Sequence, residues 1–596
     1  MQYHAPLADI RFVLYDVIGV ESVLQSLPDC NEVNRELIDA VLDEAARFTE
    51  QVLAPLNASG DQQGCHYDKA QAKVSTPDGF ADAYKAYVDA GWSGLNAPTE
   101  FGGQGLPECI GAPVKEMIDA ANLAWGTYPL LSHGATEALR QHGEDWQREA
   151  FLKPIVEGRW TGTMCLTEAH CGTDLGLLKT RAEPADDGSY RISGSKIFIT
   201  AGEHDFTENI VHLVLARLPD APAGSKGISL FIVPKMKVAH DGSMGERNQV
   251  SCGAIEHKMG LKGSATCVMN FDGAEGWLIG APNKGLAAMF TMMNTARLAV
   301  GLQGLAMIER GYQASLAYAR ERLQMRAAKG PAYPDKPADP LIVHGDIRRM
   351  LLTQKAFVEG GRALGLYAAS LVDIQHRSND AHARQRAEAL VSFLIPIVKG
   401  MLTELAVECT YDAVQIFGGH GYIGENGVEQ LARDARITTI YEGTTQIQAL
   451  DLLGRKVMQL QGAGLKLFLE DIASFCQRHA NDDAMAEFVT PLAAVTKEWS
   501  DITQALGQRI VADADELGAA AVDYLFYSGY IALAYFWARS VAAAGASTWI
   551  DAQTRASKRH TAKFYFSRIL PRTRAHLMAM QAGAQSLMAM PDAQFG

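Results

Sequence analysis

The order of secondary-structure patterns constrains this chain more than any other feature, because a β-rich stretch separates long helical stretches. Apolar residues recur at helical spacing through most of residues 36–160. From about 161 to 285 the pattern changes to short β-rich runs, of which residues 210–215 and 227–233 are the clearest. Helical patterns return at about 286 and continue to the last residues. This order excludes a Rossmann fold, which needs strands and helices in alternation.

The pattern predicts a mainly α-helical protein with a central β domain, either a barrel or a sandwich. The expected parts are an N-terminal extension (1–35), a helical N-terminal domain (36–160), a β middle domain (161–285), a helical-bundle domain (286–460) and an extra C-terminal helical domain (461–596). A chain of 596 residues is expected to form several cores, because single cores stop growing beyond about 250–300 residues.

Glycine and proline modify the two long helical segments after residue 286. Gly301 and Gly304 stand in an Ala-rich helical segment, where glycine costs about 1 kcal/mol relative to Ala, so we expect a close helix–helix approach there. The stretch between Met325 and His344 holds four prolines and is expected to be a loop. Pro396, inside the next helical segment, predicts a kink or a break.

Composition is that of a globular protein and narrows the class of partner. The formal net charge of −14 argues against a general polyanion binder, because counterion release needs a basic surface. Nine scattered cysteines without a C-x-x-C pair favour neither a disulfide framework nor a zinc site, which suggests a reducing compartment. The start lacks a basic segment followed by an apolar run, and the uncharged stretch 524–538 is too short to cross a bilayer. We therefore expect a cytoplasmic protein.

Two motifs in the β-rich region carry hydroxyls beside glycine. Thr167 and Thr173 flank Gly172, where the absence of a side chain lets a backbone amide approach a ligand closely. This set suits a flavin ring or a phosphate, but an ordinary polar turn explains the same residues. The run from Lys196 to Thr200 is β-rich and ends in a hydroxyl, although a plain strand end accounts for it equally well.

A third motif, Gln415-Ile-Phe-Gly418-Gly419-His-Gly421, concentrates glycine after a helix. Three glycines in four positions expose backbone amides that can face a pyrophosphate. A helix C-cap followed by a tight loop is the alternative. Because the motif follows a helix rather than a strand, it is not the dinucleotide fingerprint of a βαβ unit.

A fourth motif, Ile440-Tyr-Glu442-Gly443-Thr-Thr445-Gln-Ile-Gln448, places a carboxylate before a helix start. Thr445-x-x-Gln448 fits a capping box, so a helix is expected to begin here. Partial desolvation of Glu442 would raise its pKa and make it a stronger base near neutral pH. For an isolated Glu, a solvated loop position or a charge that complements the helix dipole is the more frequent explanation.

Together, these four motifs resemble the acyl-CoA dehydrogenase family, in the family's order and over residues 36–460. Residues 5–12 and the extra C-terminal segment resemble its large bacterial subfamily, which includes 3-methylmercaptopropionyl-CoA dehydrogenases and fatty acyl-CoA dehydrogenases. The resemblance implies a helical domain, a β-barrel domain and a four-helix bundle that bind FAD non-covalently. The implied reaction is α,β-dehydrogenation of an acyl-CoA thioester to the trans-2-enoyl-CoA, in fatty acid β-oxidation.

The resemblance also implies roles for individual residues. Glu442 would remove the α-proton while the β-hydrogen passes as hydride to flavin N5. The implied FAD contacts are Met164, Leu166, Thr167, Gly172, Thr173, Ile199, Thr200, Arg322, Gln415, Gly418, Gly419, Thr444 and Gln446. The implied substrate contacts are Thr173, Asn294, Arg297 and Gly443. For Arg322 a surface helix charge, and for Arg297 a structural ion pair, are the alternatives; no metal is implied.

Implied partners are an electron-transfer flavoprotein as acceptor and a second copy of the chain, in a homodimer or homotetramer. Gln415, Gly418 and Gly419 would reach the FAD of a neighbouring subunit. Two departures from the family pattern concern the shape of the FAD loops. Ala169 stands where Pro is common, and Leu-Gln-Met-Arg follows Arg322 in place of Lys/Arg-Thr-Phe-Gly.

A basic stretch near the C-terminus leaves other functions open. Its seven cations, with Asp551 as the one nearby acid, are Arg555, Lys558, Arg559, Lys563, Arg568, Arg572 and Arg574. A solvated or inter-domain helix face is the leading interpretation. Membrane-surface contact is the second, and nucleic-acid binding, which we do not expect, is the third. A DNA- or membrane-associated binding protein on the same fold therefore competes with the enzyme, as does an oxidase that passes electrons to oxygen.

Overall fold

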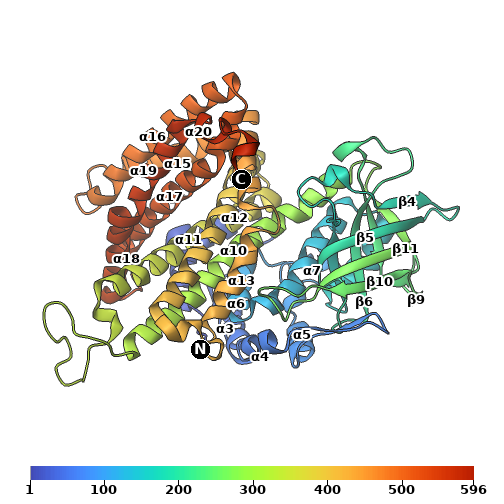
Figure 1. Ribbon diagram of the computed structural model, residues 1–596, viewed down its shortest axis with the longest axis horizontal. Helices are drawn as coiled ribbons and strands as arrows, with labels where there is room; N and C mark the ends of the chain where they lie inside the picture. Colours follow the sequence, from blue (N-terminus) through green and yellow to red (C-terminus); the bar gives the residue numbers. More distant parts are fainter. Residues whose placement is uncertain (1) are drawn as a thin grey trace. The chain divides into compact units, whose positions relative to one another are not determined.

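The computed structural model describes residues 2–596, except for the side chains at 291 and 294, and divides into two compact units (Figure 1). The helical unit comprises Met1–Ala46, Glu108–Ala120 and Val300–Gly596. The sheet unit comprises Arg47–Pro107 and Ala121–Ala299. The predicted mainly helical fold with a central β domain is confirmed, and three helices run across the boundaries between the units.

The sheet unit is built on one seven-stranded sheet with the order β3-β6-β7-β11-β5-β4, to which β10 adds beside β11. Every pair is antiparallel except the parallel pair β3–β6. A bridge between Arg181 and Arg217 links β4 back to the end of β6, which curls the sheet towards a barrel. The strands are β3 (Trp160–Cys165), β4 (Arg181–Pro184), β5 (Tyr190–Thr200), β6 (Asn209–Ala216), β7 (Ser229–Pro234), β10 (Val250–Ile255) and β11 (Thr266–Ile279). Two small hairpins pair β1 (His66–Asp68) with β2 (Lys73–Ser75) and β8 (Met236–Val238) with β9 (Met244–Arg247).

Residue type explains which strands lie deepest. Every residue of β6 and β7 is buried, as expected of continuous Val, Ile and Leu runs covered on both faces. Helix α7 (Leu123–His142) lies against β3, and a Cβ on Gly162 would come within 2.4 Å of Ala135 Cβ. Glycine at that position therefore permits the close approach of helix and strand. The other helices of the unit are α4 (Leu56–Gln63), α5 (Phe80–Asp89), α8 (Asp145–Gln147) and α9 (Lys153–Val156).

The helical unit centres on three long helices, α10 (Gly285–Glu321), α11 (Gly345–Arg377) and α12 (Ala381–Phe417). The expected close approach at the glycines is confirmed. A Cβ on Gly301 would lie 2.6 Å from Val398 Cγ1, and one on Gly304 would lie 2.7 Å from the carbonyl oxygen of Leu402, both on α12. Of the kink or break predicted at Pro396, the break does not occur, because α12 continues through that residue. Pro396 is buried with its neighbours, and this packing offsets the lost hydrogen bond, which costs about 3 kcal/mol.

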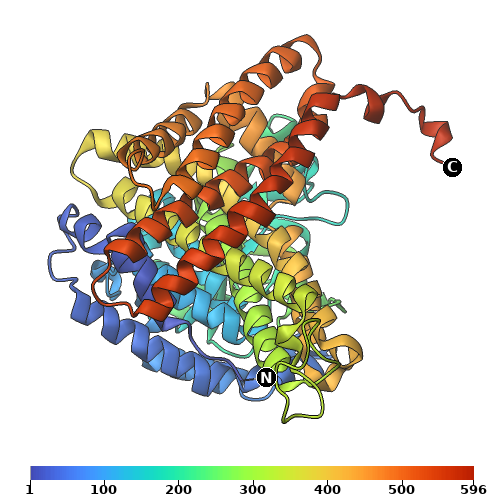
Figure 2. The same cartoon turned by 90° about the vertical axis from the view of Figure 1, so that its left-hand side faces the viewer.

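Shorter helices complete the helical unit, and Figure 2 shows α16 to α19 side by side. They are α1 (Leu7–Phe12), α2 (Val20–Gln25), α3 (Arg35–Phe48), α6 (Glu108–Ala121), α13 (Val428–Arg436), α14 (Thr445–Leu450), α15 (Ala463–Arg478), α16 (Ala486–Ala512), α17 (Asp515–Ala546), α18 (Ala552–Phe564), α19 (Thr573–Ala582) and α20 (Gln585–Met588). A π-helical turn, η12 (Asp451–Gln459), follows α14.

Two helices have the length and composition to cross a membrane, Ala381–Tyr422 and Asp515–Ala546. Of their most apolar windows, 78% and 67% is buried within the protein. This burial is typical of core helices.

The predicted loop after α10 is confirmed, and one carboxylate organises it. Asp339 accepts hydrogen bonds from the backbone amides of Ala327 (2.8 Å), Ala332 (3.0 Å) and Tyr333 (2.8 Å). Burial alone would raise the pKa of Asp339, but these amides and Arg326 lower it to about 2. The loop is therefore a compact turn around a charged acceptor.

Candidate active site

Glu442 lies in the short turn that leads into α14, and its backbone is strained. Its φ is +55°, and Gly443, which follows it, has a φ of +91°. A residue other than glycine in this left-handed region costs on the order of 1–3 kcal/mol and is typical of functional turns. The side chain is half-buried. Among the eight described non-glycine residues with a positive φ, Glu442 is the only one with an ionisable side chain, which makes this turn a candidate catalytic position.

Two side chains of the helical unit hold the turn in place. Lys399, fully buried on α12, donates from Nζ to the carbonyl oxygen of Gly443 at 2.6 Å. Gln448, on α14, donates from Nε2 to the carbonyl oxygen of Glu442 at 3.1 Å. These bonds fix the peptide planes on both sides of Gly443. The orientation of the Glu442 backbone is thus set by two different helices.

The predicted capping box is wrong by one residue. The N-cap of α14 is Thr444, whose Oγ1 accepts from the amide of Ile447 at 3.3 Å. Thr445 is the first residue of the helix, and its hydroxyl donates to Glu404 instead. Two adjacent threonines compete for the same role, and the one with extended ψ before the helix takes it. Gln446 is exposed on the first turn.

A hydrogen bond between Tyr441 and Gln303 also supports the turn. Tyr441 donates from its hydroxyl to Gln303 Oε1. Burial, together with the nearby charges of Asp119, Glu442 and Asp434, raises the pKa of Tyr441 well above its usual value. Tyr441 therefore stays protonated and remains a donor at any pH near neutrality.

The first two sequence motifs meet in the sheet unit. The amide of Ile197, in β5, donates to the carbonyl oxygen of Thr167 at 2.9 Å. Thr200 ends β5 and pairs with Thr266 of β11. Among residues 2–596, the hydroxyls of Thr167, Thr173 and Thr200 have no protein hydrogen-bond partner. These unused donors and acceptors suit a polar ligand such as the flavin ring or its chain.

Sequence reasoning gave no role to the ion pair that holds this region. Glu168 accepts from Lys196 Nζ at 2.9 Å, from Thr180 Oγ1 at 2.6 Å and from the amide of Lys179 at 2.7 Å. Burial by itself raises the pKa of Glu168, but Lys196 and these donors lower it to about 2. Lys196 opens the β-rich run noted in the sequence, so a lysine at the start of an apolar run was the signal available.

Glu168 also belongs to the one group in the described residues with metal-ligand spacing. Ligand atoms of Glu168, His170 and Cys171 lie within 4.8 Å of one another. The Glu168 carboxylate is already taken by Lys196 and Thr180. The group is therefore better explained as the anchor of the Thr167 turn.

The remaining predicted cofactor residues of the sheet unit surround these hydroxyls in the sequence. Met164 and Leu166 are half-buried, Ile199 is buried, and Gly172 and Thr173 are exposed. Arg297, on α10, is buried with 6% exposure. The prediction for Asn294 falls on a side chain outside the described residues.

In the helical unit, the glycine motif forms an open turn at the end of α12. Gly418, with a φ of +59°, caps the helix, and nothing lies within 4 Å of the Cβ position of Gly418 or Gly419. Gln415 and both glycines are exposed. Backbone amides in such a turn are accessible to an anionic group such as a pyrophosphate.

Aromatic contacts tie the glycine turn to the end of α10, where exposed Arg322 follows. Tyr318 stacks on Phe417 with ring centroids 4.1 Å apart, and its hydroxyl is 2.9 Å from His420 Nδ1. The structure thus brings the elements that carry Arg322 and the glycines together. The unused hydroxyls of the sheet unit are donors of the kind that FAD needs, and so, within the helical unit, are the amides of the open glycine turn and Arg322.

The basic stretch near the C-terminus is mostly engaged within the helical unit. Six of its seven cations bond to acids or carbonyls, through the pairs Arg555–Ala544, Lys558–Asp9, Arg559–Glu487, Lys563–Glu487, Arg572–Glu408 and Arg574–Glu498. Arg568 is exposed. These partners favour a helix face that is partly solvated and paired within its own unit, which agrees with the leading interpretation from sequence, a solvated or inter-domain helix face.

Comparison with known proteins identifies the family of this chain from matches along most of its length. Family models match in order: acyl-CoA dehydrogenase N-terminal domain (36–159), middle domain (163–274), C-terminal domain (283–458) and an acetyl-CoA dehydrogenase C-terminal-like domain (468–591). The chain belongs to the acyl-CoA dehydrogenase family.

Named relatives cover nearly the full length. The chain is 42% identical to 3-methylmercaptopropionyl-CoA dehydrogenase of Ruegeria pomeroyi, over 96% of both chains. It is 32% identical to the broad-specificity linear acyl-CoA dehydrogenase FadE5 of Mycobacterium tuberculosis, over 100% of both chains. The solved acyl-CoA dehydrogenase of Bacillus anthracis complexed with FAD has the same fold, with a TM-score of 0.74, 20% identity, and coverage of 94% of this chain and 90% of that chain.

These findings confirm the predicted class of enzyme. The protein is an FAD-dependent oxidoreductase that dehydrogenates acyl-CoA thioesters.

Proposed function

We propose that Glu442 is the base that removes the α-proton of the acyl-CoA thioester. The observation that carries the proposal is the strained, doubly anchored turn: a left-handed Glu whose carbonyl and following carbonyl are held by Gln448 and Lys399. An α-C–H group is a very weak acid, so its base must be held in a fixed position. Bound FAD supplies the two-electron acceptor for the β-hydrogen.

We propose that each unit contributes residues that bind FAD, with the glycine turn contacting the FAD of a neighbouring subunit. In the sheet unit the hydroxyls of Thr167, Thr173 and Thr200 bind polar edges of the cofactor, beside the Gly172 backbone and the apolar side chains of Met164, Leu166 and Ile199. In the helical unit Arg322 and the turn at Gln415, Gly418 and Gly419 bind the anionic part, with Thr444 and Gln446 as further contacts. The support is that the three hydroxyls lack protein partners and the glycine turn is open.

We propose two candidate acyl substrates. Fatty acyl-CoA oxidation in β-oxidation is one candidate, and 3-methylmercaptopropionyl-CoA is favoured by the 42% identical relative. Gly443, Thr173, Arg297 and Asn294 are the proposed substrate contacts. The sharpest test compares 3-methylmercaptopropionyl-CoA with pentanoyl-CoA, which differ only by sulfur in place of a methylene. A preference for the thioether in kcat/KM supports it, and equal values with a better butyryl- or hexanoyl-CoA support β-oxidation.

The role of Glu442 is tested by Glu442→Gln. We expect the variant to keep bound FAD but to lose roughly 10²–10⁴-fold in turnover, the usual scale for a positioned general base. Anaerobic bleaching of the flavin by acyl-CoA is the measurement. Glu388→Gln, an exposed change on α12, is the matched control and should bleach normally. Full activity of Glu442→Gln would remove Glu442 from this role.

We further propose an electron-transfer flavoprotein as acceptor and a homodimer or homotetramer as the assembly. Turnover with that flavoprotein, without peroxide release, would separate the dehydrogenase from the oxidase; sedimentation gives the assembly. A cytoplasmic location is proposed because all nine cysteines are free. The five parts bounded near 35, 160, 285 and 460 are proposed as its domains, which limited proteolysis tests.

A further inference from the structure

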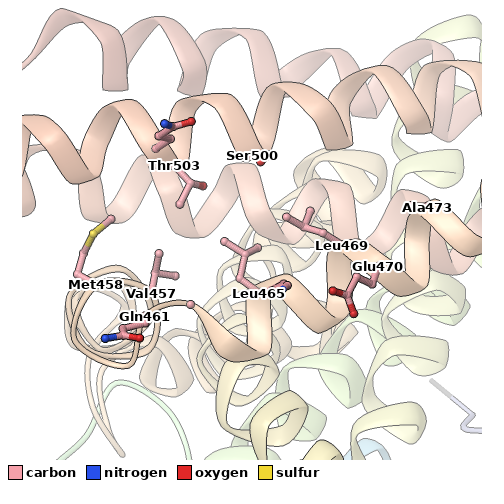
Figure 3. A pocket seen from close by; sticks show the side chains of 12 residues that line it. Val457, Met458, Gln461, Leu465, Leu469, Glu470, Ala473, Ser500 and Thr503 are labelled. Carbon is pink, nitrogen blue, oxygen red and sulfur yellow. The ribbon is translucent and has the colours of Figure 1, made fainter.

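A groove between the C-terminal helices contains none of the residues proposed for the active site. A cavity of about 600 Å³ lies between η12, α15 and α16, and Figure 3 shows its side chains pointing into the space between these helices. Its floor is apolar, from Val457, Leu465 and Leu469. Lys466 and Glu470 are exposed at the rim. The volume is within the range of about 300–1,000 Å³ that encloses a bound group.

Segment 585–596, hereafter the exposed segment, has the opposite character. All of its residues are exposed, and its large apolar side chains are Leu587 (58%), Met588 (60%), Met590 (42%) and Phe595 (72%). Its one charged residue is Asp592. Among residues 2–596, its side chains make no hydrogen bond or ion pair with any other part of the chain. Burial of such side chains against an apolar surface is favourable, so this segment is a candidate for docking.

The start of the exposed segment is fixed. The amide of Ala584, which is buried, donates to Glu516 Oε1 at 3.1 Å, and Arg509 bonds to the carbonyl oxygen of Met580 at 2.8 Å. Figure 2 shows the residues beyond this anchor running away from the helices of their own unit. The exposed segment therefore begins at a fixed anchor and then leaves the helices of its own unit.

The apolar side chains of the exposed segment match the character of the groove. Leu587 and Met588, at the end of α20 (Gln585–Met588), are exposed apolar side chains of the kind that fill an apolar groove. Methionine adapts to irregular apolar walls. Lys466 has no ion-pair partner in the part of the chain that the structure describes, and Asp592 supplies the complementary charge. Twelve residues can extend over at most about 40 Å, enough to reach a neighbouring molecule.

We propose that the exposed segment of one molecule docks into the η12–α15–α16 groove of a second copy of this chain. Leu587 and Met588 cover the apolar floor, and Asp592 pairs with Lys466 of that second copy. Reciprocal exchange of two segments closes the assembly, as a two-fold interface requires. The proposal is independent of the assignment of Glu442.

Cysteine cross-linking of the holoenzyme tests the exchange. Met588→Cys and Ala473→Cys are placed in separate, differently tagged chains; Ala473 is an exposed residue of the groove wall. After mixing under mild oxidation, we expect a disulfide between the two tagged chains. Ser567→Cys, exposed on another turn, mixed with Ala473→Cys is the control and should give none. Absence of the inter-chain product would overturn the proposal, as would a product found only within one chain carrying both cysteines.

Charge exchange gives a second readout. Lys466→Glu should lower the yield of cross-linked product about two- to fivefold, the scale of an exposed ion pair, and Asp592→Lys in the partner chain should restore it. No restoration, with loss in both single variants, would contradict the proposed pairing. The four substituted positions, Lys466, Ala473, Met588 and Asp592, are all exposed, so we expect the variants to fold.

Discussion

Buried charge is used differently in the two units. In the helical unit Arg362, with 1% of its side chain exposed, donates to Glu116 and to Glu309 at 2.6 Å and also to Asp9. Lys558 joins the cluster through Asp9 and, at 2.9 Å, through Glu359. In the sheet unit buried charge occurs in separate small groups, among them the pair Lys196–Glu168 at 2.9 Å and Glu203 with Lys235 and Arg247.

The two arrangements differ in how many elements of the fold they connect. The Arg362 cluster connects α1, α6, α10, α11 and α18, and Lys558 and Asp9 are 549 residues apart in the sequence. The partners of the Lys196–Glu168 pair are 28 residues apart and fix one turn. Each buried charge costs several kcal/mol unless it is balanced. The cluster therefore makes the first helix and the C-terminal helices depend on the bundle, whereas the pair acts locally.

The largest effect is expected from Arg362→Met. It leaves Glu116 and Glu309 buried without their cation, which should lower the free energy of unfolding by about 3–5 kcal/mol. Urea unfolding of the holoenzyme is the measurement. Arg349→Met, which breaks the exposed pair with Asp346, is the control and should cost less than about 1 kcal/mol. An equal loss of unfolding free energy in the two variants would show that the buried cluster stabilises the protein no more than an exposed ion pair does.

Lys196→Met should cost less, about 1.5–3 kcal/mol, because Glu168 keeps its bonds from Thr180 and Lys179. Its second effect should be weaker FAD binding, since the same turn carries Thr167. Flavin release on dilution measures it. Lys179→Met, an exposed neighbour whose amide rather than side chain binds Glu168, is the control. Unchanged flavin affinity would separate the ion pair from the cofactor turn.

Acid should weaken both arrangements. The pKa of Asp9, which burial alone would raise, is lowered to about 2 by Lys558 and Arg362, and that of Glu168 is also about 2. A carboxylate with a lowered folded-state pKa stabilises the protein above its unfolded pKa of about 4, and this is lost as pH falls towards 2. In Lys196→Met the contribution from Glu168 should shrink while that from Asp9 remains. A stability profile between pH 5 and 2 measures this; a profile identical to the parent would refute the local role of the pair.

The smallest effect is expected from Arg574→Ala. Its side chain is 64% exposed where it meets Glu498, so the loss should be about 0–1 kcal/mol and should fade with added salt. Thermal unfolding at two salt concentrations is sufficient. A loss comparable to that of Arg362→Met would mean that the C-terminal helix face is held by its surface pairs after all.

Local sequence was enough for much of the fold and for the candidate turns. The alternation of long helical and β-rich stretches, the loop after α10 and the glycine contacts of α10 depend on residue type and spacing within a segment. The turn at Glu442 was also located, because Glu-Gly before a threonine-capped helix is a local signal. Its strained backbone and its anchors on Lys399 and Gln448 were not visible from sequence.

Tertiary structure alone decided the rest. Pro396 does not break α12 because packing outweighs one missing hydrogen bond, and the cap fell on Thr444 rather than Thr445 because only one of them has the extended backbone. The ion-pair partners of Lys558, Arg362 and Lys196 could not be predicted from sequence either. A charged residue in a buried segment indicates that it has a counterion, but the sequence does not show which residue that is. Residue spacing along the chain therefore determined the helices and strands and the position of Glu442 in its turn. The ion pairs and hydrogen bonds that hold these elements together were determined by burial, which depends on all the neighbours of a residue at the same time.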